Sequence, residues 1–344
     1  MSDQRTAQSN PVEAAVPTEG RAIEADEGFD TDTDSAISEE DIASLTTSLS
    51  SSVRDYVYEN GRRYHKFREG EYLFPNDDAE QDRLDMVHHI FRLMLGGSLH
   101  MAPLDSPQRV LDIGTGTGIW ALDMADEFPG AEVLGIDLSP IQPYWYVPNC
   151  QFVVDDVEAP WSYPPNRSFD YIHQRNMVGA INDWDQLFKQ GLQHLRPGGY
   201  YEVQEFRVWF HDQDERRPGS EESSIDLWQR NLTEGTARFG KPLNVVEQLA
   251  AKMKDAGFAG VREQVLKIPI GSWPKDKPLK KIGQWMQVHA ADSVEPLTLA
   301  LFTRVLGWSE LECRVLIAKV RQEFRENRQL YVYAHFIHGQ KPGV

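Results

Sequence analysis

A short apolar stretch that runs directly into a glycine-rich turn constrains the fold of this chain more than any other feature. The stretch covers residues 109–113, and Gly114, Gly116 and Gly118 follow it before a helical pattern begins at residue 119. Glycine is needed where the backbone adopts a positive φ or must approach a ligand closely. A buried strand that enters such a turn and then a helix is typical of the first unit of a doubly wound α/β sheet.

Strand and helix patterns continue to alternate after this turn, which predicts a Rossmann-like α/β fold with a doubly wound sheet. The last strand is aromatic and alternating. The expected strands are residues 109–113, 133–136, 152–154, 170–173, 200–206, 261–268 and 330–337. The expected helices are residues 78–95, 119–128, 183–195 and 243–256.

Composition divides the chain into three parts. Residues 1–52 are poor in aromatic residues and rich in Asp, Glu, Ser and Thr. They cannot bury enough apolar surface to offset their conformational entropy, so we expect a disordered acidic tail. Residues 53–105 are expected to form an N-terminal helical cap segment, and residues 106–344 the α/β domain. Helical insertions at residues 209–242 and 271–328 are expected to lie over the carboxyl edge of the sheet, where ligands bind.

The charge of the chain argues against a nucleic-acid partner. Its formal net charge is −18, of which residues 1–50 carry −10. Sequence-independent binding to DNA or RNA needs clustered Lys and Arg. Cys150 and Cys313 lack metal-ligand spacing, which favours free thiols over a disulfide or a zinc site. A signal peptide and a run of about 18 apolar residues are both absent, so we expect no membrane partner and a cytoplasmic or nuclear location.

Acidic residues end the first three expected strands of the domain. Asp112 precedes the glycine turn and suits the ammonium of a cofactor that carries an amino acid, whereas it would repel a pyrophosphate. Asp137 ends the second strand, where a carboxylate accepts hydrogen bonds from two adjacent ribose hydroxyls. Asp155 or Asp156, after the third strand, can accept a hydrogen bond from the exocyclic amine of adenine.

An NAD-binding turn is the main alternative. Residues 116–121 satisfy the dinucleotide pattern G-x-G-x-x-[GA], and Asp137 follows Gly116 by 21 residues. Asp112 and the acidic pair after the third strand disfavour this alternative, because a nicotinamide dinucleotide has no amino-acid group to meet Asp112.

These motifs together resemble a known enzyme family. The runs VLDIGTGTGIWA, GIDLSPIQP, FVVDDVEAPW, FDYIHQRNMVGAINDW and LRPGGYYEVQE are similar to the class I S-adenosylmethionine-dependent methyltransferases. With the upstream runs NGRRYH and YLFPND, they resemble more narrowly the fungal LaeA-like methyltransferases, over about residues 55–205. The resemblance implies that S-adenosyl-L-methionine is the cofactor and that the last strand of the sheet runs antiparallel to its neighbour. The contacts that it implies come from Asp112, Gly114, Thr115, Gly116, Gly118, Asp137, Leu138, Asp155, Asp156, Val157 and Gln174.

Candidate catalytic and substrate residues follow from the expected position of the reacting sulfur. The resemblance places residues 173–175 near the sulfonium. Methyl transfer needs a nucleophile that is held in line and often relieved of a proton. His173 and Glu205 are candidate bases, with His65 and Glu202 as further candidates. Tyr64 and Arg175 are candidate substrate contacts, and Arg175 could instead hold a carboxylate of the cofactor.

Three functions are compatible with the sequence. The first is a methyltransferase that acts on a small molecule of secondary metabolism. The second is a LaeA-like regulatory methyltransferase that acts through protein partners on development and secondary-metabolite gene expression, with the acidic tail as an interaction arm. The third is an NAD(P)-dependent oxidoreductase. In the first two cases the methyl acceptor is a small molecule or a protein.

Overall fold

An eight-stranded sheet forms the centre of the protein, whose computed structural model describes residues 16–18, 22–25, 56–65, 73–143, 147–213, 223–326 and 328–343. The strand order is β5-β4-β3-β6-β7-β10-β8, and β9 pairs with the other edge of β10. The strands are β3 (Arg109–Ile113), β4 (Glu132–Asp137), β5 (Cys150–Val154), β6 (Phe169–Arg175), β7 (Leu195–Phe206), β8 (His211–Asp212), β9 (Ala259–Ile270) and β10 (Leu330–Gln340).

The sheet is parallel from β5 to β7 and antiparallel at β10. This confirms the predicted doubly wound sheet with an antiparallel last strand. The chain moves outward from β3 through β4 to β5 and then returns to place β6 on the other side of β3. The carboxyl end of β3 is therefore a topological switch point, where ligands bind in open α/β sheets.

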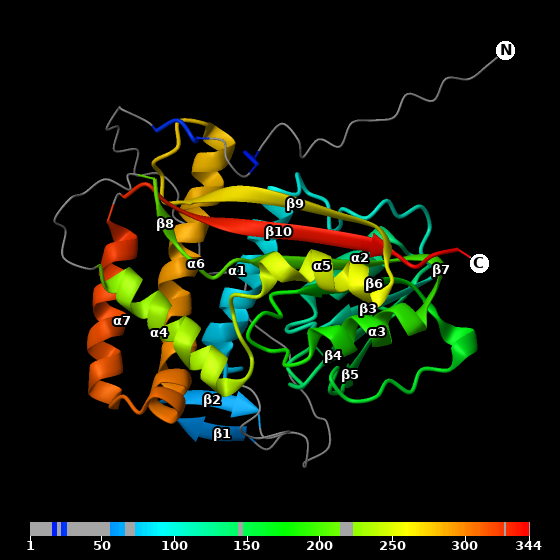
Figure 1. Ribbon diagram of the computed structural model, residues 1–344, viewed down its shortest axis with the longest axis horizontal. Helices are drawn as coiled ribbons and strands as arrows, with labels where there is room; N and C mark the ends of the chain where they lie inside the picture. The colour runs from blue at the N-terminus through cyan, green and yellow to red at the C-terminus, as the bar shows by residue number, and fades with distance from the viewer. Residues whose placement is uncertain are drawn as a thin grey trace.

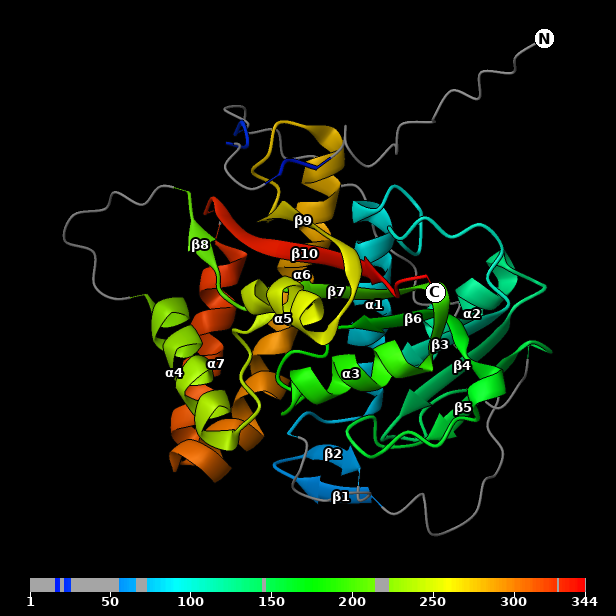
Figure 2. The ribbon, with the colours of Figure 1, turned by 45° about the vertical axis from the view of Figure 1, so that its right-hand side comes forward.

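Four helices cover the two faces of the sheet: α1 (Asp78–Met94), α2 (Ile119–Glu127), α3 (Trp184–His194) and α5 (Val246–Ala256). Figure 2 shows α3 and α5 in front of the sheet and α1 behind it. Each helix lies within a few residues of its predicted position. One difference is at β7, which begins at Leu195, because Leu195 already pairs with Phe169 of β6. The predicted break at residues 197–199 lies in an irregularity of register, after which pairing resumes at Tyr200. In the described part of the chain no helix could cross a membrane.

The two insertions form a helical layer at one end of the sheet, seen in Figure 1 as α4, α6 and α7. They comprise α4 (Ser224–Phe239), α6 (Lys277–Leu301), the π-helical turn η4 (Phe302–Leu306) and α7 (Glu310–Arg325). The backbone of α6 is held directly, because Gly271 N donates to Gly283 O at 2.8 Å. A Cβ on Gly283 would lie 2.1 Å from Gly271 O, so only glycine permits this approach.

An antiparallel hairpin occupies residues 56–65, where a helical cap segment was expected. Its strands are β1 (Tyr56–Glu59) and β2 (Arg62–His65), and the turn between them is Asn60-Gly61 with φ values of 51° and 79°. Two residues with positive φ form the type I′ turn that Asn-Gly favours. The hairpin could therefore have been predicted from this dipeptide. The helical part of the cap segment is α1 alone.

Two short stretches of the acidic segment pack on the outer edge of the sheet, which differs from the prediction of an undocked tail. Residues 16–18 pair with β9, where Lys267 N donates to Pro17 O at 2.8 Å. Residues 22–25 pair beside Pro274, and Lys275 N donates to Glu24 O at 2.8 Å. Val16 and Ile23 are each only 4% exposed. The rest of residues 1–52 lies outside the described residues.

Removing residues 1–25 is expected to lower the melting temperature by roughly 1–3 °C without changing cofactor affinity. Burying Val16 and Ile23 stabilises the fold by about 1.5–3 kcal/mol each before the entropy of ordering is subtracted. A net loss of about 1–2 kcal/mol corresponds to a shift of roughly 1–3 °C for a chain of this length. Calorimetric unfolding of the truncated chain measures this shift, and the double substitution Val16→Ser with Ile23→Ser should reproduce it. An unchanged melting temperature in both proteins would contradict the docking of these stretches.

Candidate functional site

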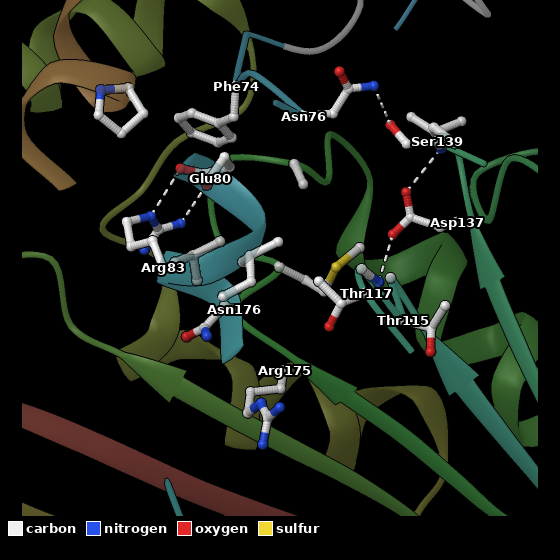
Figure 3. A pocket seen from close by; sticks show the side chains of 18 of the residues that line it. Phe74, Asn76, Glu80, Arg83, Thr115, Thr117, Asp137, Ser139, Arg175 and Asn176 are labelled. Carbon is white, nitrogen blue, oxygen red and sulfur yellow. Dashed lines mark hydrogen bonds and ion pairs between the residues drawn. The ribbon is translucent and has the colours of Figure 1, made fainter. Parts of the chain in front are cut away.

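A large cavity lies at the carboxyl ends of β3, β4 and β6 and extends between α1 and α6. Its volume is about 1920 Å³ when the space at its open mouth is included. Strand-end residues such as Asp112 and Asp137 and residues of the α1–α6 gap such as Arg83 and Met286 line the same cavity, so the two parts are continuous. Figure 3 shows Phe74 with the Glu80–Arg83 pair on one side of the cavity and Asp137 with Ser139 on the other.

The glycine turn forms one wall of the cavity at the switch point. Gly114 and Gly116 line the cavity, with φ values of 64° and 58°. A Cβ on Gly114 would meet the Met177 side chain at 2.2 Å. Gly118 does not line the cavity, which differs from its predicted contact with the cofactor. Its φ is 84°, and a Cβ there would collide with the Phe152 ring at 2.5 Å, so this glycine serves helix–strand packing.

Asp137 lies at the end of β4 with its carboxylate turned to the glycine turn. Its two oxygens accept from Gly116 N and from Ser139 N, both at 2.9 Å, as Figure 3 shows. Burial raises the pKa of Asp137 to about 6, and the two backbone donors partly oppose this shift. The carboxylate still has lone pairs toward the cavity, which it lines together with Leu138. It can therefore accept hydrogen bonds from a ligand's hydroxyl groups.

Affinity for an adenosine-bearing ligand is expected to fall as the pH drops below about 6, the pKa of Asp137. The carboxylate accepts from two hydroxyl groups more strongly than the carboxylic acid, one of whose oxygens carries a proton, so protonation opposes ligand binding. Affinity is complete above that pKa and weakens below it, to about one tenth at pH 5 of its value at pH 8. Titration of S-adenosylhomocysteine across this range measures the profile. Asp137→Asn should bind weakly with a flat profile, whereas a flat profile in the wild type would remove Asp137 from the site.

Asp112 ends β3 beside a buried aromatic stack. One oxygen accepts from Thr115 Oγ1 at 2.6 Å, and the other pairs with His173 Nδ1 at 2.7 Å. The His173 ring stacks on Trp120, with centroids 3.7 Å apart and planes 7° apart. Asp112, Thr115 and His173 all line the cavity. However, His173 Nε2 is enclosed and has no partner among the described residues. His173 therefore orients Asp112 and cannot reach a substrate proton in this conformation.

The acids after β5 form the third part of this wall. Asp155, Asp156 and Val157 line the cavity. Asp155 Oδ1 accepts from Asp156 N at 2.8 Å, and Asp156 Oδ1 accepts from Glu158 N at 2.9 Å. Three consecutive parallel strands thus end in carboxylates that face one cavity, as the sequence predicted. We call this wall, made of residues 112–117, 137–139 and 155–157, the strand-end pocket.

Three residues that were expected to contact the cofactor or act as bases do not line the cavity. Gln174 is fully buried, and its Oε1 accepts from Tyr201 OH at 2.6 Å. Glu205 accepts from Met177 N at 2.6 Å and from Val178 N at 3.4 Å, and burial raises the pKa of Glu205 to about 8. Glu202 accepts from two backbone amides of the loop at residues 101–102. These side chains hold loops in place, which differs from the expected cofactor contact of Gln174 and from the expected base at Glu202 or Glu205.

The aromatic candidate Tyr64 also lies away from the cavity. Its ring is buried in the core, and the Arg304 guanidinium lies 5.3 Å from the ring centroid. Tyr64 is not among the residues that line the cavity, so its expected substrate contact is not seen in this conformation. The side chain of His65 lies outside the described residues.

Arg175, at the end of β6, lines the cavity, and its contact with a substrate stays a prediction. Its Nη2 lies 3.2 Å from His88 Nδ1, and its guanidinium lies 5.1 Å from the Phe91 ring centroid. Burial lowers the pKa of Arg175 to about 10, so the side chain is charged at neutral pH. His88 Nε2 in turn lies 3.0 Å from Asp123 Oδ2. Arginine can only donate, so Nδ1 of His88 accepts and its Nε2 carries the proton toward Asp123.

Several cavity residues were not predicted because they come from segments distant in sequence. Asn76 Nδ2 donates to Ser139 Oγ at 3.3 Å across 63 positions, and so ties the start of α1 to the end of β4. Glu80, Arg83 and His289 line the part of the cavity between α1 and α6. Of these residues, Asn76 alone lay in a motif that the sequence analysis used, the family-like run YLFPND.

A parallel sheet with this strand order, an antiparallel last strand and acids at three consecutive strand ends around a glycine turn defines a class of enzyme. The protein is an S-adenosylmethionine-dependent methyltransferase.

Comparison with known proteins gives the family. Residues 86–264 match the family described as a methyltransferase domain, and the chain belongs to it. The chain is 45% identical to the methyltransferase pytC of Aspergillus terreus, with 83% of this chain and 88% of that protein covered. It is 38% identical to the secondary metabolism regulator LAE1 of Cochliobolus heterostrophus, with 80% and 91% covered. It is 36% identical to the protein-methionine methyltransferase laeA of Emericella nidulans, with 83% and 76% covered.

The strongest of these similarities confirm the resemblance that the motifs predicted. They also exclude the third function considered, an NAD(P)-dependent oxidoreductase, because the matched family is a methyltransferase domain and the relative pytC is a methyltransferase.

Proposed function

We propose that this methyltransferase acts on a small apolar molecule of secondary metabolism, held beside the cofactor in the same cavity. The single observation that carries this proposal is the apolar part of the cavity next to the strand-end pocket. That part, which we call the apolar chamber, is lined by Phe74, Ile181, Phe206, Phe210, Leu243 and Met286. Apolar walls with a few convergent polar groups are typical of small-molecule sites.

The strand-end pocket has a set of groups that matches S-adenosylmethionine. In this proposal Asp112 holds the ammonium, and the backbone of the glycine turn passes along the methionine end. Asp137 accepts from the ribose hydroxyls, and Asp156 with the Val157 amide reads the adenine amine. The orientation of Asp112 by Thr115 and His173 supports this assignment, because both contacts fix the carboxylate toward the cavity wall.

The protein's contribution to the reaction is placement and exclusion of water. The bound cofactor supplies a methyl group on a positively charged sulfur. The chain holds the acceptor in line with that group, and a well-oriented pair of reactants gains several kcal/mol over free encounter. The acidic strand ends favour a cationic ligand, and α1 and α6 close the chamber from two sides. No covalent bond to the enzyme is needed.

Transfer of a labelled methyl group tests this function. The purified protein is incubated with methyl-labelled S-adenosylmethionine and cell extract, and label is followed in the solvent-extractable and protein fractions. We expect label in the extractable fraction, and none when the inactive variant Asp137→Ala replaces the wild type. Label confined to protein would overturn the small-molecule proposal.

A regulatory methyltransferase that acts through protein partners is the second candidate. It is favoured by the similarity to LAE1 and laeA, whose names describe a regulator of secondary metabolism and a protein-methionine methyltransferase. In that case the acidic N-terminal segment is the interaction arm and the site of action is the nucleus, whereas the biosynthetic role places the protein in the cytoplasm. The acidic charge supports neither DNA nor RNA as a partner.

A further inference from the structure

One face of α6 forms the wall of the apolar chamber. Met286, His289, Ser293 and Leu297 recur at helical spacing and all line the cavity. His289 is the nitrogen-bearing member of this face, and it is buried. Its Nδ1 lies 3.4 Å from Arg83 Nη1, and Arg83 is held by Glu80 through two contacts, one of them 2.9 Å long.

The contact with Arg83 decides which nitrogen of His289 carries the proton. A guanidinium has donors and no acceptor, so Nδ1 must accept and Nε2 must carry the hydrogen. Burial, followed by the charge of Arg83, lowers the pKa of His289 well below its ordinary value, so the ring is neutral. In the described part of the chain His289 Nε2 has no partner, and it is not among the enclosed unpaired atoms. His289 therefore offers the chamber an N–H donor and cannot accept a proton there.

The charged groups around the cavity reinforce this donor. Three of its cations are paired, namely Arg83 with Glu80, Arg207 with Glu247 and Lys241 with Glu158. Arg175 has no carboxylate within 4 Å in the described residues. The carboxylates that balance its charge, Asp112, Asp123, Glu205 and Asp85, all act from a longer distance, so an anion that reaches Arg175 from the cavity would gain a direct ion pair.

Outside the strand-end pocket, the carboxylates that line the cavity in the described residues are engaged, Glu158 by Lys241 and by the amides of Asn182 and Asp183. Both oxygens of Glu80 are held by Arg83. Glu205 lies below the cavity, and both of its oxygens accept from backbone amides. An ammonium acceptor, which must lose a proton before it can attack, would therefore find cations and donors in the chamber, and carboxylates that are already engaged. An acid that ionises by itself would find both its counter-ion and a hydrogen bond.

We propose that the methyl acceptor is an oxygen acid on an apolar skeleton, such as an enol or a phenol, whose anion is held by Arg175 and whose neighbouring carbonyl oxygen accepts from His289 Nε2. This inference rests on the proposed function and names its substrate class. The hydroxyl loses its proton to solvent before transfer. The oxyanion then forms the bond to the methyl carbon while the carbon–sulfur bond breaks and its electron pair goes to sulfur, which yields a methyl ether and neutral S-adenosylhomocysteine sulfur.

Binding of three probes of similar size to the protein saturated with S-adenosylhomocysteine tests this class. The first probe is 4-hydroxycoumarin, an acidic enol with a neighbouring carbonyl. The second is coumarin, which lacks the hydroxyl group. The third is 1-naphthylmethylamine, which carries an ammonium group. We expect 4-hydroxycoumarin to bind at least about tenfold more tightly than coumarin, because hydrogen bonds to charged groups contribute at least that factor. The amine should bind no more tightly than coumarin. With S-adenosylmethionine, mass spectrometry should detect the methyl ether of 4-hydroxycoumarin.

Variants separate this recognition from general damage to the chamber. His289→Phe and Arg175→Gln should each reduce the preference for 4-hydroxycoumarin over coumarin by about tenfold, while His289→Gln, whose amide can still donate, retains part of it. The matched control is His338→Phe, because His338 also has a pKa lowered by burial but does not line the cavity. It should leave the preference unchanged.

Two outcomes would overturn the inference while S-adenosylhomocysteine still binds. One is equal or tighter binding of coumarin or the amine. The other is a preference for 4-hydroxycoumarin that survives both His289→Phe and Arg175→Gln. Failure of S-adenosylhomocysteine to bind the wild type would instead overturn the proposed function, and this inference with it.

Discussion

Replacing Asp137 by alanine is expected to weaken binding of S-adenosylhomocysteine by at least a hundredfold. The carboxylate is the one group at the end of β4 that can accept from both ribose hydroxyls, and each such bond contributes about 1.5–3 kcal/mol. Alanine also leaves Gly116 N and Ser139 N without their acceptor, which loosens the glycine turn. Isothermal titration of the purified variant measures the loss directly.

A matched substitution separates this effect from general destabilisation. Asp126 is an exposed acid on α2, outside the cavity. Asp126→Ala should bind S-adenosylhomocysteine as the wild type does. Wild-type affinity in Asp137→Ala, with an unchanged circular dichroism spectrum, would mean that the ribose lies elsewhere.

Replacing Gly283 by alanine is expected to lower the free energy of unfolding by at least about 2 kcal/mol. The new Cβ would lie 2.1 Å from the backbone oxygen of Gly271, which cannot move as a flexible side chain would. The helix α6 must shift away from the sheet edge, and overpacking of this kind costs about 1–3 kcal/mol or more. The shift also weakens the bond from Gly271 N to Gly283 O. Chemical unfolding followed by circular dichroism measures the change.

The substitution Gly283→Ala should affect the two parts of the cavity differently, because only the apolar chamber is lined by α6. The strand-end pocket contains no residue of α6, so cofactor affinity in Gly283→Ala should change little, whereas binding in the apolar chamber should weaken. Gly130→Ala is the matched control, since a Cβ there would meet nothing within 4 Å. Equal stability of Gly283→Ala and Gly130→Ala would contradict the close docking of α6.

The part of the site that the sequence predicted is the part built from strand ends. A parallel strand delivers its last residue to a known edge of the sheet, so Asp112, Asp137 and Asp156 could be placed together without knowledge of their contacts. Successive side chains of a strand point to opposite faces of the sheet, and this rule could have excluded Gln174 from the cofactor contacts. Its neighbours His173 and Arg175 point to the opposite face.

The chamber could not be predicted in the same way, because it depends on contacts between distant segments. The pair of Arg83 and His289 joins helices 206 positions apart, and neither residue carries a local signal of its partner. The docked stretches of the acidic segment were overlooked for a different reason. An average composition over fifty residues conceals two short apolar stretches around Val16 and Ile23.

Calorimetric titration of the full chain with S-adenosylhomocysteine and, separately, with NAD⁺ tests the central claim most directly. The account predicts one saturable site for S-adenosylhomocysteine, with affinity that weakens below the pKa of Asp137, and no measurable heat from NAD⁺. Binding of NAD⁺ with no response to S-adenosylhomocysteine would contradict it.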